Sequence, residues 1–194
     1  MDESIKVVVL GTGQMGAGMI RLLQSKPALE LVGVFGRRMH HRPVDAGIAA
    51  GLGSELGFNV SGDLATLLED TSPDIALQAT CSTVIDAEPE IRALLEHGVN
   101  VISIAEEMAY PAYSHPQLAA SLDQLARTRS ATLLGTGINP GFVLDLLVVA
   151  LSGTCQRIDR IEARRVNDLA PYGPTVLACQ GVGLTTTQFE EGVL

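Results

Sequence analysis

The stretch VVVLGTGQMGAG, residues 7–18, decides the fold. It places Gly11, Gly13 and Gly16 in the spacing G-x-G-x-x-G, directly after an apolar run and before apolar residues at helical spacing. In such a turn the first glycine permits a tight bend, the second lets a pyrophosphate approach, and the third lets the helix pack on the strand. We therefore expect a dinucleotide site; the alternative is an ordinary glycine-rich turn. Its expected cofactor contacts are Gly11, Thr12, Gly13, Gln14, Met15 and Gly16.

Outward from this turn, strand-like and helix-like segments alternate. This alternation predicts an α/β fold with a doubly wound parallel sheet of the Rossmann type, with its ligand at the carboxyl ends of the strands. Residues 36–62 are poorly periodic and are expected to be a loop with one short helix. Strands are predicted at residues 5–10, 29–35, 74–80, 100–104 and 131–135, and helices at 17–25, 90–98, 116–127 and 143–151.

The segment RIDRIEARRV, residues 157–166, breaks this pattern because polar and apolar residues alternate in it. Alternation is typical of a half-exposed strand, whereas the earlier strands are continuously apolar. We therefore place a domain boundary near Gly153. Residues 1–153 are expected to form the dinucleotide-binding domain, and residues 154–194 to begin an α+β substrate domain.

Composition excludes several classes of function. The formal net charge of -9 argues against nucleic-acid binding, which needs a basic face. The three cysteines fit neither a disulfide framework nor a zinc pattern, so we expect no metal site and a reducing, cytoplasmic location. No apolar run approaches membrane-spanning length, and no membrane contact is expected.

The end of the second predicted strand indicates which dinucleotide is bound. An NAD site usually has an acidic residue here for the ribose hydroxyl, but the chain has Gly36 followed by Arg37 and Arg38. Guanidinium groups suit a phosphate, which favours NADP, with NAD possible. The alternative is a solvated basic loop. His40 and His41 are expected on the surface or beside the adenine.

A second glycine turn, GTGINPGF at residues 135–142, should lie at the same edge of the sheet. It is poorly suited to a second dinucleotide because Pro140 lacks an amide donor. Its amides, with Asn139 and Gly141, should instead bind substrate beside the nicotinamide. Asn139 could equally cap a helix that starts at Pro140, and both roles are compatible. Thr80, Cys81 and Ser82 end another strand and are expected near the nicotinamide ribose, Cys81 without a nucleophilic role.

Five motifs, VVVLGTGQMGAG, ATCSTV, ISIAEEMAYP, GTGINPGFVLDLL and ARRVNDLAPYG, resemble the 2,4-diaminopentanoate dehydrogenase family. This family is grouped with dihydrodipicolinate reductase and diaminopimelate dehydrogenase, and in the latter a similar turn lies beside the substrate. The resemblance implies NAD(P)-dependent oxidation of 2,4-diaminopentanoate to 2-amino-4-oxopentanoate and ammonia, in ornithine degradation. It also implies a homo-oligomer and a longer polypeptide, so we expect the chain to be truncated within its second domain.

Three alternatives remain beside this one. Dihydrodipicolinate reductase is disfavoured because Arg164 and Arg165 stand where its His-His pair is found, without the following Lys and Ser-Gly-Thr loop. A related dehydrogenase acting on another amino acid fits the same motifs. A non-catalytic dinucleotide-binding module would keep the first turn without the chemistry.

A small substrate with two ammonium groups and one carboxylate needs acidic residues and a cation around it. Glu106 and Glu107 follow the strand at 100–104, and either could bind an ammonium or accept its proton. The alternative is that one of them caps a helix or forms a salt bridge, and Glu106 is our candidate for the substrate role. Asp168 is the second acidic candidate. Arg164 and Arg165 should point to opposite faces, and we assign Arg165 to the carboxylate. Asp145 is expected to be structural and Tyr172 to enter from the second domain.

Overall fold

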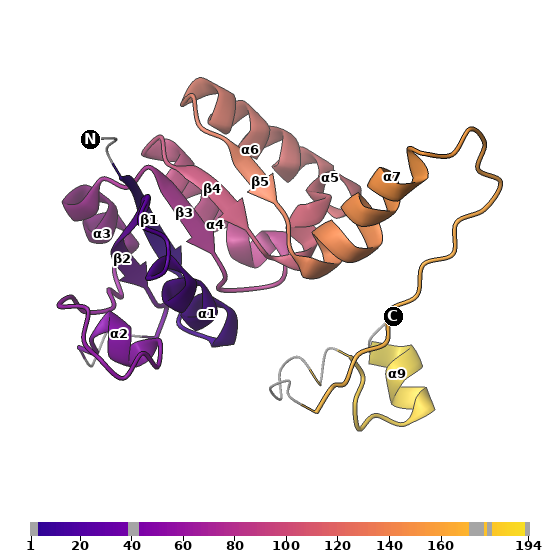
Figure 1. Ribbon diagram of the computed structural model, residues 1–194, viewed down its shortest axis with the longest axis horizontal. Coiled ribbons are helices and arrows are strands. Elements are labelled where there is room, and N and C mark those ends of the chain that lie inside the picture. Colours follow the sequence, from indigo (N-terminus) through magenta and orange to yellow (C-terminus); the bar gives the residue numbers. More distant parts are fainter. Residues whose placement is uncertain (1–3, 39–42, 171–176, 178–179, 193–194) are drawn as a thin grey trace. The chain divides into compact units, whose positions relative to one another are not determined.

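The βαβ unit around the first glycine turn forms as predicted. The structure, a computed structural model, describes residues 4–38, 43–170, 177 and 180–192. Strand β1 spans Ile5–Leu10, helix α1 spans Gln14–Leu23 and strand β2 spans Leu29–Phe35. The two strands are parallel and pair from Ile5 with Leu29 to Leu10 with Phe35 (Figure 1).

Three further strands complete a sheet that is entirely parallel. They are β3 (Ile75–Gln78), β4 (Asn100–Ser103) and β5 (Leu133–Gly135). The strand order is β2-β1-β3-β4-β5, so the chain leaves β1 toward one side and returns to its other side. Ligands of doubly wound sheets bind where the order reverses in this way, at the carboxyl ends of the strands. The predicted fold class is confirmed.

The core lies on both faces of the sheet because side chains of β1 alternate between them. Val7 and Val9 pack in a cluster with Ile20 of α1. Val8 packs on the other face in a cluster with Ile91, which lies on helix α4 (Val84–Glu96). Helix α6 (Pro116–Thr128) and helix α3 (Leu64–Thr71) bury leucines in this second cluster. Both faces are therefore covered, as a parallel sheet requires.

The loop region between β2 and β3 is partly as predicted. One short helix, α2 (Ala46–Ala49), lies within residues 36–62. Helix α3 follows and was not predicted, although its start carries a recognisable signal: the Asp63 carboxylate accepts hydrogen bonds from Ala65 N at 3.0 Å and Thr66 N at 3.3 Å. An aspartate at this position caps helices by satisfying free amides of the first turn.

Asp45 fixes the loop around α2. Its Oδ1 accepts hydrogen bonds from Gly47 N at 2.7 Å and Leu56 N at 2.9 Å, and its Oδ2 accepts one from Gly57 N at 2.9 Å. The hydrogen bond from Leu56 N contributes most to lowering the pKa of Asp45 below its ordinary value. A carboxyl group with a lowered pKa stabilises the folded protein above the unfolded-state pKa, and this contribution is lost as the pH falls through the folded value.

We predict that Asp45→Asn lowers the melting temperature at pH 7, because an amide group cannot accept from all three backbone donors. The difference from the unmodified protein should shrink below about pH 4, near the ordinary aspartate pKa. Thermal unfolding followed by circular dichroism at several pH values measures both effects. Asp70→Asn, at an exposed position of α3, is the control. A difference that stays constant with pH would contradict the assignment.

The remaining elements follow β4 and β5. A short 3-10 helix, η1, spans Glu106–Ala109 and is followed by α5 (Pro111–Ser114). The segment η2 spans Ile138–Leu146 and continues as α7 (Leu147–Ser152), and α9 spans Thr186–Gly192. Contacts divide the chain into two units, Met1–Gln156 and Arg157–Leu194.

The strand predicted at residues 157–166 is wrong, since these residues form no strand. Alternating polarity tells which side chains share a face, but a strand also needs a neighbour for its backbone hydrogen bonds. No neighbouring strand accompanies this segment within the described residues. Local ion pairs two residues apart, Arg157 with Asp159 and Arg160 with Glu162, join side chains along it.

Candidate dinucleotide and substrate site

The three glycines of the first turn have different surroundings. Gly11 has a positive φ of 115°, and a Cβ atom there would lie 2.6 Å from the Ala79 carbonyl oxygen at the end of β3. A Cβ atom at Gly16 would lie 1.9 Å from the Gly11 carbonyl oxygen. Gly13 has no atom within 4 Å of its Cβ position. The fold therefore requires the first and third glycines, whereas the second faces open space.

A cleft of about 390 Å³ opens beside Gly13. It joins the first turn to the ends of β2 and β3, at the place where the strand order reverses. Gly13 is the N-terminal cap residue of α1 and has no side chain to occupy the amides of the first turn, which leaves them available for a phosphate. The open backbone and the helix start thus fit a dinucleotide. The lining residues are Gly11, Thr12, Gly13, Gly36, Arg37, Arg38, Ala79 and Thr80.

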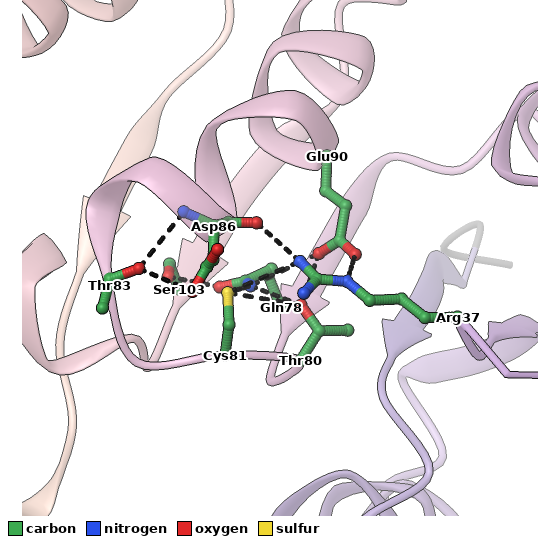
Figure 2. Close-up of polar contacts among 8 residues, drawn as sticks. All are labelled: Arg37, Gln78, Thr80, Cys81, Thr83, Asp86, Glu90 and Ser103. Atoms are coloured by element: carbon green, nitrogen blue, oxygen red, sulfur yellow. Dashed lines mark hydrogen bonds and ion pairs between the residues drawn. The ribbon is translucent and has the colours of Figure 1, made fainter. Parts of the chain in front are cut away.

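Arg37 and Arg38 differ in their contacts, although both line the cleft. The Arg37 Nε donates to Glu90 Oε1 at 2.6 Å, and its Nη2 donates to the Asp86 carbonyl oxygen at 2.6 Å. The hydrogen bond with Glu90 is the main cause of the raised pKa of Arg37. Figure 2 shows this side chain extending from β2 toward α4. Arg38 is exposed, while His40 and His41 lie outside the described residues.

Behind Arg37 lies a buried polar network that the sequence analysis missed. Gln78 Nε2 donates to Thr80 Oγ1 at 2.7 Å and to Cys81 Sγ at 3.2 Å, and Ser103 Oγ donates to Gln78 Oε1 at 2.5 Å. The Thr80 hydroxyl also donates to Glu90. The network joins the ends of β3 and β4 to α4 (Figure 2). Gln78 inside an apolar strand was the available signal, because a buried amide needs partners.

The two glutamates that follow β4 differ in exposure and in their hydrogen bonds. Glu107 Oε2 accepts a hydrogen bond from Val84 N at 2.8 Å and so caps the start of α4. Glu106 is exposed at the first position of η1. One member of the pair therefore has a structural role, as considered from the sequence, and Glu106 remains the candidate for substrate.

The second glycine turn packs against η1. A Cβ atom at Gly135 would lie 1.8 Å from the Met108 carbonyl oxygen, and Thr136 N donates to the Ser103 carbonyl oxygen at 2.9 Å. This close approach fixes the turn next to the segment that carries Glu106. The turn and Glu106 therefore share the carboxyl edge of the sheet, where both were predicted to lie.

The backbone of this turn differs from the helix start considered above. Asn139 and Pro140 are extended, with ψ of 115° and 160°, so Pro140 is not the first helical residue and Asn139 is not its cap. Helical geometry begins only after Gly141, whose φ is 124° and whose N–H donates to Asp145 Oδ2 at 2.7 Å. The structural role expected for Asp145 is confirmed.

The second unit carries the other two candidates. Arg165 is half-buried and its Nε donates to Asn167 Oδ1 at 2.8 Å, whereas Arg164 is exposed. Asp168 Oδ1 accepts from Ala170 N at 2.9 Å. Tyr172 lies outside the described residues. Ser82, Gln14 and Met15, from the predicted cofactor contacts, are exposed in the first unit.

This fold and cleft define the class of protein: a Rossmann-type nucleotide-binding domain that continues into a further unit. A family model described as dihydrodipicolinate reductase, N-terminus, matches residues 5–104, and one described as 2,4-diaminopentanoate dehydrogenase C-terminal domain matches residues 142–194. The chain belongs to the family of the first model, which covers more than half of its residues. The resemblance to 2,4-diaminopentanoate dehydrogenase inferred from the sequence is confirmed.

Two curated proteins and one solved structure are similar to the chain over most of its length. The chain is 40% identical to 2,4-diaminopentanoate dehydrogenase of Acetoanaerobium sticklandii over 98% of its own length and 54% of the relative's. It is 29% identical to an amine dehydrogenase of Streptomyces virginiae over 87% of its length and 47% of that protein. The solved amine dehydrogenase of Mycobacterium smegmatis is 37% identical and superimposes with a TM-score of 0.84, over 99% of this chain and 56% of that one.

The chain thus spans about half the length of the curated relatives it matches. The dehydrogenase relatives and the nucleotide-binding domain together indicate NAD or NADP as the cofactor. Within the residues that the structure describes, no helix combines the length and the apolar character needed to span a membrane.

Proposed function

We propose that the protein is an NAD(P)-dependent dehydrogenase that oxidatively deaminates 2,4-diaminopentanoate to 2-amino-4-oxopentanoate and ammonia, a step of ornithine degradation. The observation that carries this proposal is the 40% identity to 2,4-diaminopentanoate dehydrogenase, over an alignment of 192 residues that spans 98% of the chain. The open cleft at Gly13 supports the cofactor part of the proposal.

In this proposal residues 1–153 bind the dinucleotide and residues 154–194 begin the substrate domain, which also forms the interface of a cytoplasmic homo-oligomer. The proposed cofactor contacts are the first glycine turn, Arg37 and Arg38 after β2, and Thr80, Cys81 and Ser82 at the end of β3. Arg37 is held by its contacts with Glu90 and the Asp86 carbonyl oxygen, so Arg38 is the more available of the two. NADP is preferred over NAD because, among the residues that the structure describes, the cleft lining has no carboxylate that would repel a 2'-phosphate, and Arg38 is exposed there.

The chemistry requires the C4 amine to be neutral before hydride leaves. We assign the Glu106 carboxylate to accept that proton, which agrees with its exposed position at the carboxyl edge of the sheet. A bound nicotinamide supplies the hydride acceptor. Water then attacks the iminium carbon, and ammonia leaves as the C4 ketone forms. Each turnover therefore releases one ammonia for each hydride removed from C4.

Other residues would hold the two ends of the substrate that do not react. We propose that Asn139 and the Gly141 region of the second turn contact the substrate beside the nicotinamide. Arg165 would bind the carboxylate, as a bidentate guanidinium suits that group. Asp168 would bind the remaining ammonium or exchange its proton.

A second candidate is favoured by the amine dehydrogenase relatives, namely the same reaction on a simple monoamine. The test is to compare 2,4-diaminopentanoate with 2-aminopentane, which keeps the reacting carbon but lacks the amino-acid end. Reduction of NADP or NAD is followed by absorbance. A strong preference in kcat/KM for the diamino acid supports the proposal, and equal or better use of the monoamine replaces it by the second candidate.

A further inference from the structure

The buried carboxylate of Glu90 stands next to the cofactor cleft without belonging to its lining. Its side chain is only 8% exposed and it lies on α4, whereas its partner Arg37 comes from the end of β2 and is 40% exposed. The pair therefore joins the cleft lining after β2 to α4. Figure 2 shows the Arg37 side chain reaching Glu90.

Hydrogen bonds, as well as the charge of Glu90, hold the Arg37 guanidinium in place. Nε donates to Glu90 at 2.6 Å, Nη2 donates to the Asp86 carbonyl oxygen at 2.6 Å, and Nη2 also lies 3.6 Å from Cys81 Sγ. Glu90 is itself held by the Thr80 hydroxyl and by Gln78 Nε2 at 3.4 Å. Arg37 can turn toward a phosphate in the cleft only if these contacts break, because its donors are fixed in one fork.

The closeness of the Arg37 and Glu90 charges affects how strongly the cleft attracts a phosphate. A phosphate in the cleft is attracted by Arg37, which lines the cleft, and is repelled by the Glu90 carboxylate paired with it, so Glu90 cancels part of the attraction that Arg37 would exert alone. Arg38 lines the same cleft and is exposed. Attraction for an additional phosphate group then comes mainly from Arg38. Arg37 adds only the part of its positive charge that Glu90 does not neutralise.

We propose that Glu90 is a specificity-determining positioning residue that acts through Arg37: by holding and neutralising Arg37, it limits the preference for NADP over NAD. This inference rests on the proposed cofactor function and deepens it. Glu90 is not assigned any contact with the cofactor. Its removal should free Arg37 to face the ribose 2'-phosphate, which only NADP carries.

The test measures dissociation constants of NADP and NAD separately, by calorimetry on the purified protein at low salt. Glu90→Gln should tighten NADP binding about tenfold and change NAD binding little, since one opposing charge near the phosphate is lost. The gain should decrease at high salt. Glu88→Gln removes the same charge from α4, where Glu88 pairs with Arg92 instead, and should leave the ratio unchanged.

Two arginine variants provide a test that does not depend on the folding of Glu90→Gln. The preference for NADP is expressed as the ratio Kd(NAD)/Kd(NADP). Arg37→Met alone leaves the Glu90 charge uncompensated and should lower this ratio about tenfold, as should Arg38→Met. Arg37→Met added to Glu90→Gln should abolish the tenfold gain. Circular dichroism confirms the fold of each variant.

The outcomes separate this inference from the proposed function. If the unmodified protein binds neither dinucleotide, the proposed function fails and this inference fails with it. If both bind and folded Glu90→Gln leaves the ratio unchanged, only the inference is overturned. It is also overturned if the gain of Glu90→Gln persists when Arg37→Met is added.

Discussion

Replacement of Gly13 by threonine is expected to weaken NADP and NAD binding about 100-fold while changing the free energy of unfolding by less than about 1 kcal/mol. The fold tolerates the change because no atom lies within 4 Å of the Cβ position and threonine is as good an N-cap as glycine. Binding of both dinucleotides weakens because the threonine side chain prevents the pyrophosphate from reaching the backbone amides. Losing two hydrogen bonds to a charged group, at about 1.5 kcal/mol each, corresponds to this factor.

Gly16→Ala provides the contrast within the same turn. Its Cβ atom would lie 1.9 Å from the Gly11 carbonyl oxygen, so we expect a loss of about 3 kcal/mol in stability. Urea unfolding and calorimetric binding distinguish the two variants. Unaltered dinucleotide binding by a folded Gly13→Thr protein would contradict the placement of the pyrophosphate.

Glu106→Gln is the second variant with a large expected effect. We predict that kcat/KM for 2,4-diaminopentanoate falls about 100- to 1,000-fold, which lies within the range of about 100- to 10,000-fold typical for loss of a general base. The fall should appear mainly in kcat, because the amide preserves the shape of the side chain. The dissociation constant for NADP should not change. Steady-state kinetics and calorimetry measure these quantities.

The neighbouring Glu107 is the matched control. Glu107→Gln also removes one carboxylate from η1, but this residue caps α4 through Val84 N. Its amide oxygen can still accept that bond, so we expect a loss of at most about 1 kcal/mol in stability and little change in kcat. Equal losses of activity in the two variants would show that Glu106 has no special role.

The fold was predictable from the sequence where local pattern and tertiary structure agree. The run before Gly11 is apolar on both faces because both faces are covered, and the glycine spacing sets the turn that follows it. Both ends of β1 and of β2 were therefore placed correctly. The carboxyl-edge position of Glu106 and of the second turn also followed from the parallel topology.

Other features depend on contacts that a single sequence does not display. Polar and apolar residues do alternate at residues 157–166, but these residues form no strand. A strand also needs a neighbouring strand, which the pattern of one segment does not reveal. The Arg37 side chain was interpreted only by its charge, whereas its direction is set by Glu90, which lies 53 residues away in sequence. Helix α3 was missed although the Asp63 cap was visible, because the segment is short.

The central claim is that hydride leaves C4 of 2,4-diaminopentanoate for a bound nicotinamide. The most direct test supplies substrate deuterated at C4 together with NADP or NAD, and measures deuterium in the reduced nicotinamide and ammonia in the same sample. The account predicts transfer of deuterium and one ammonia for each reduced cofactor. Binding of the dinucleotide without transfer of deuterium from this substrate would contradict it.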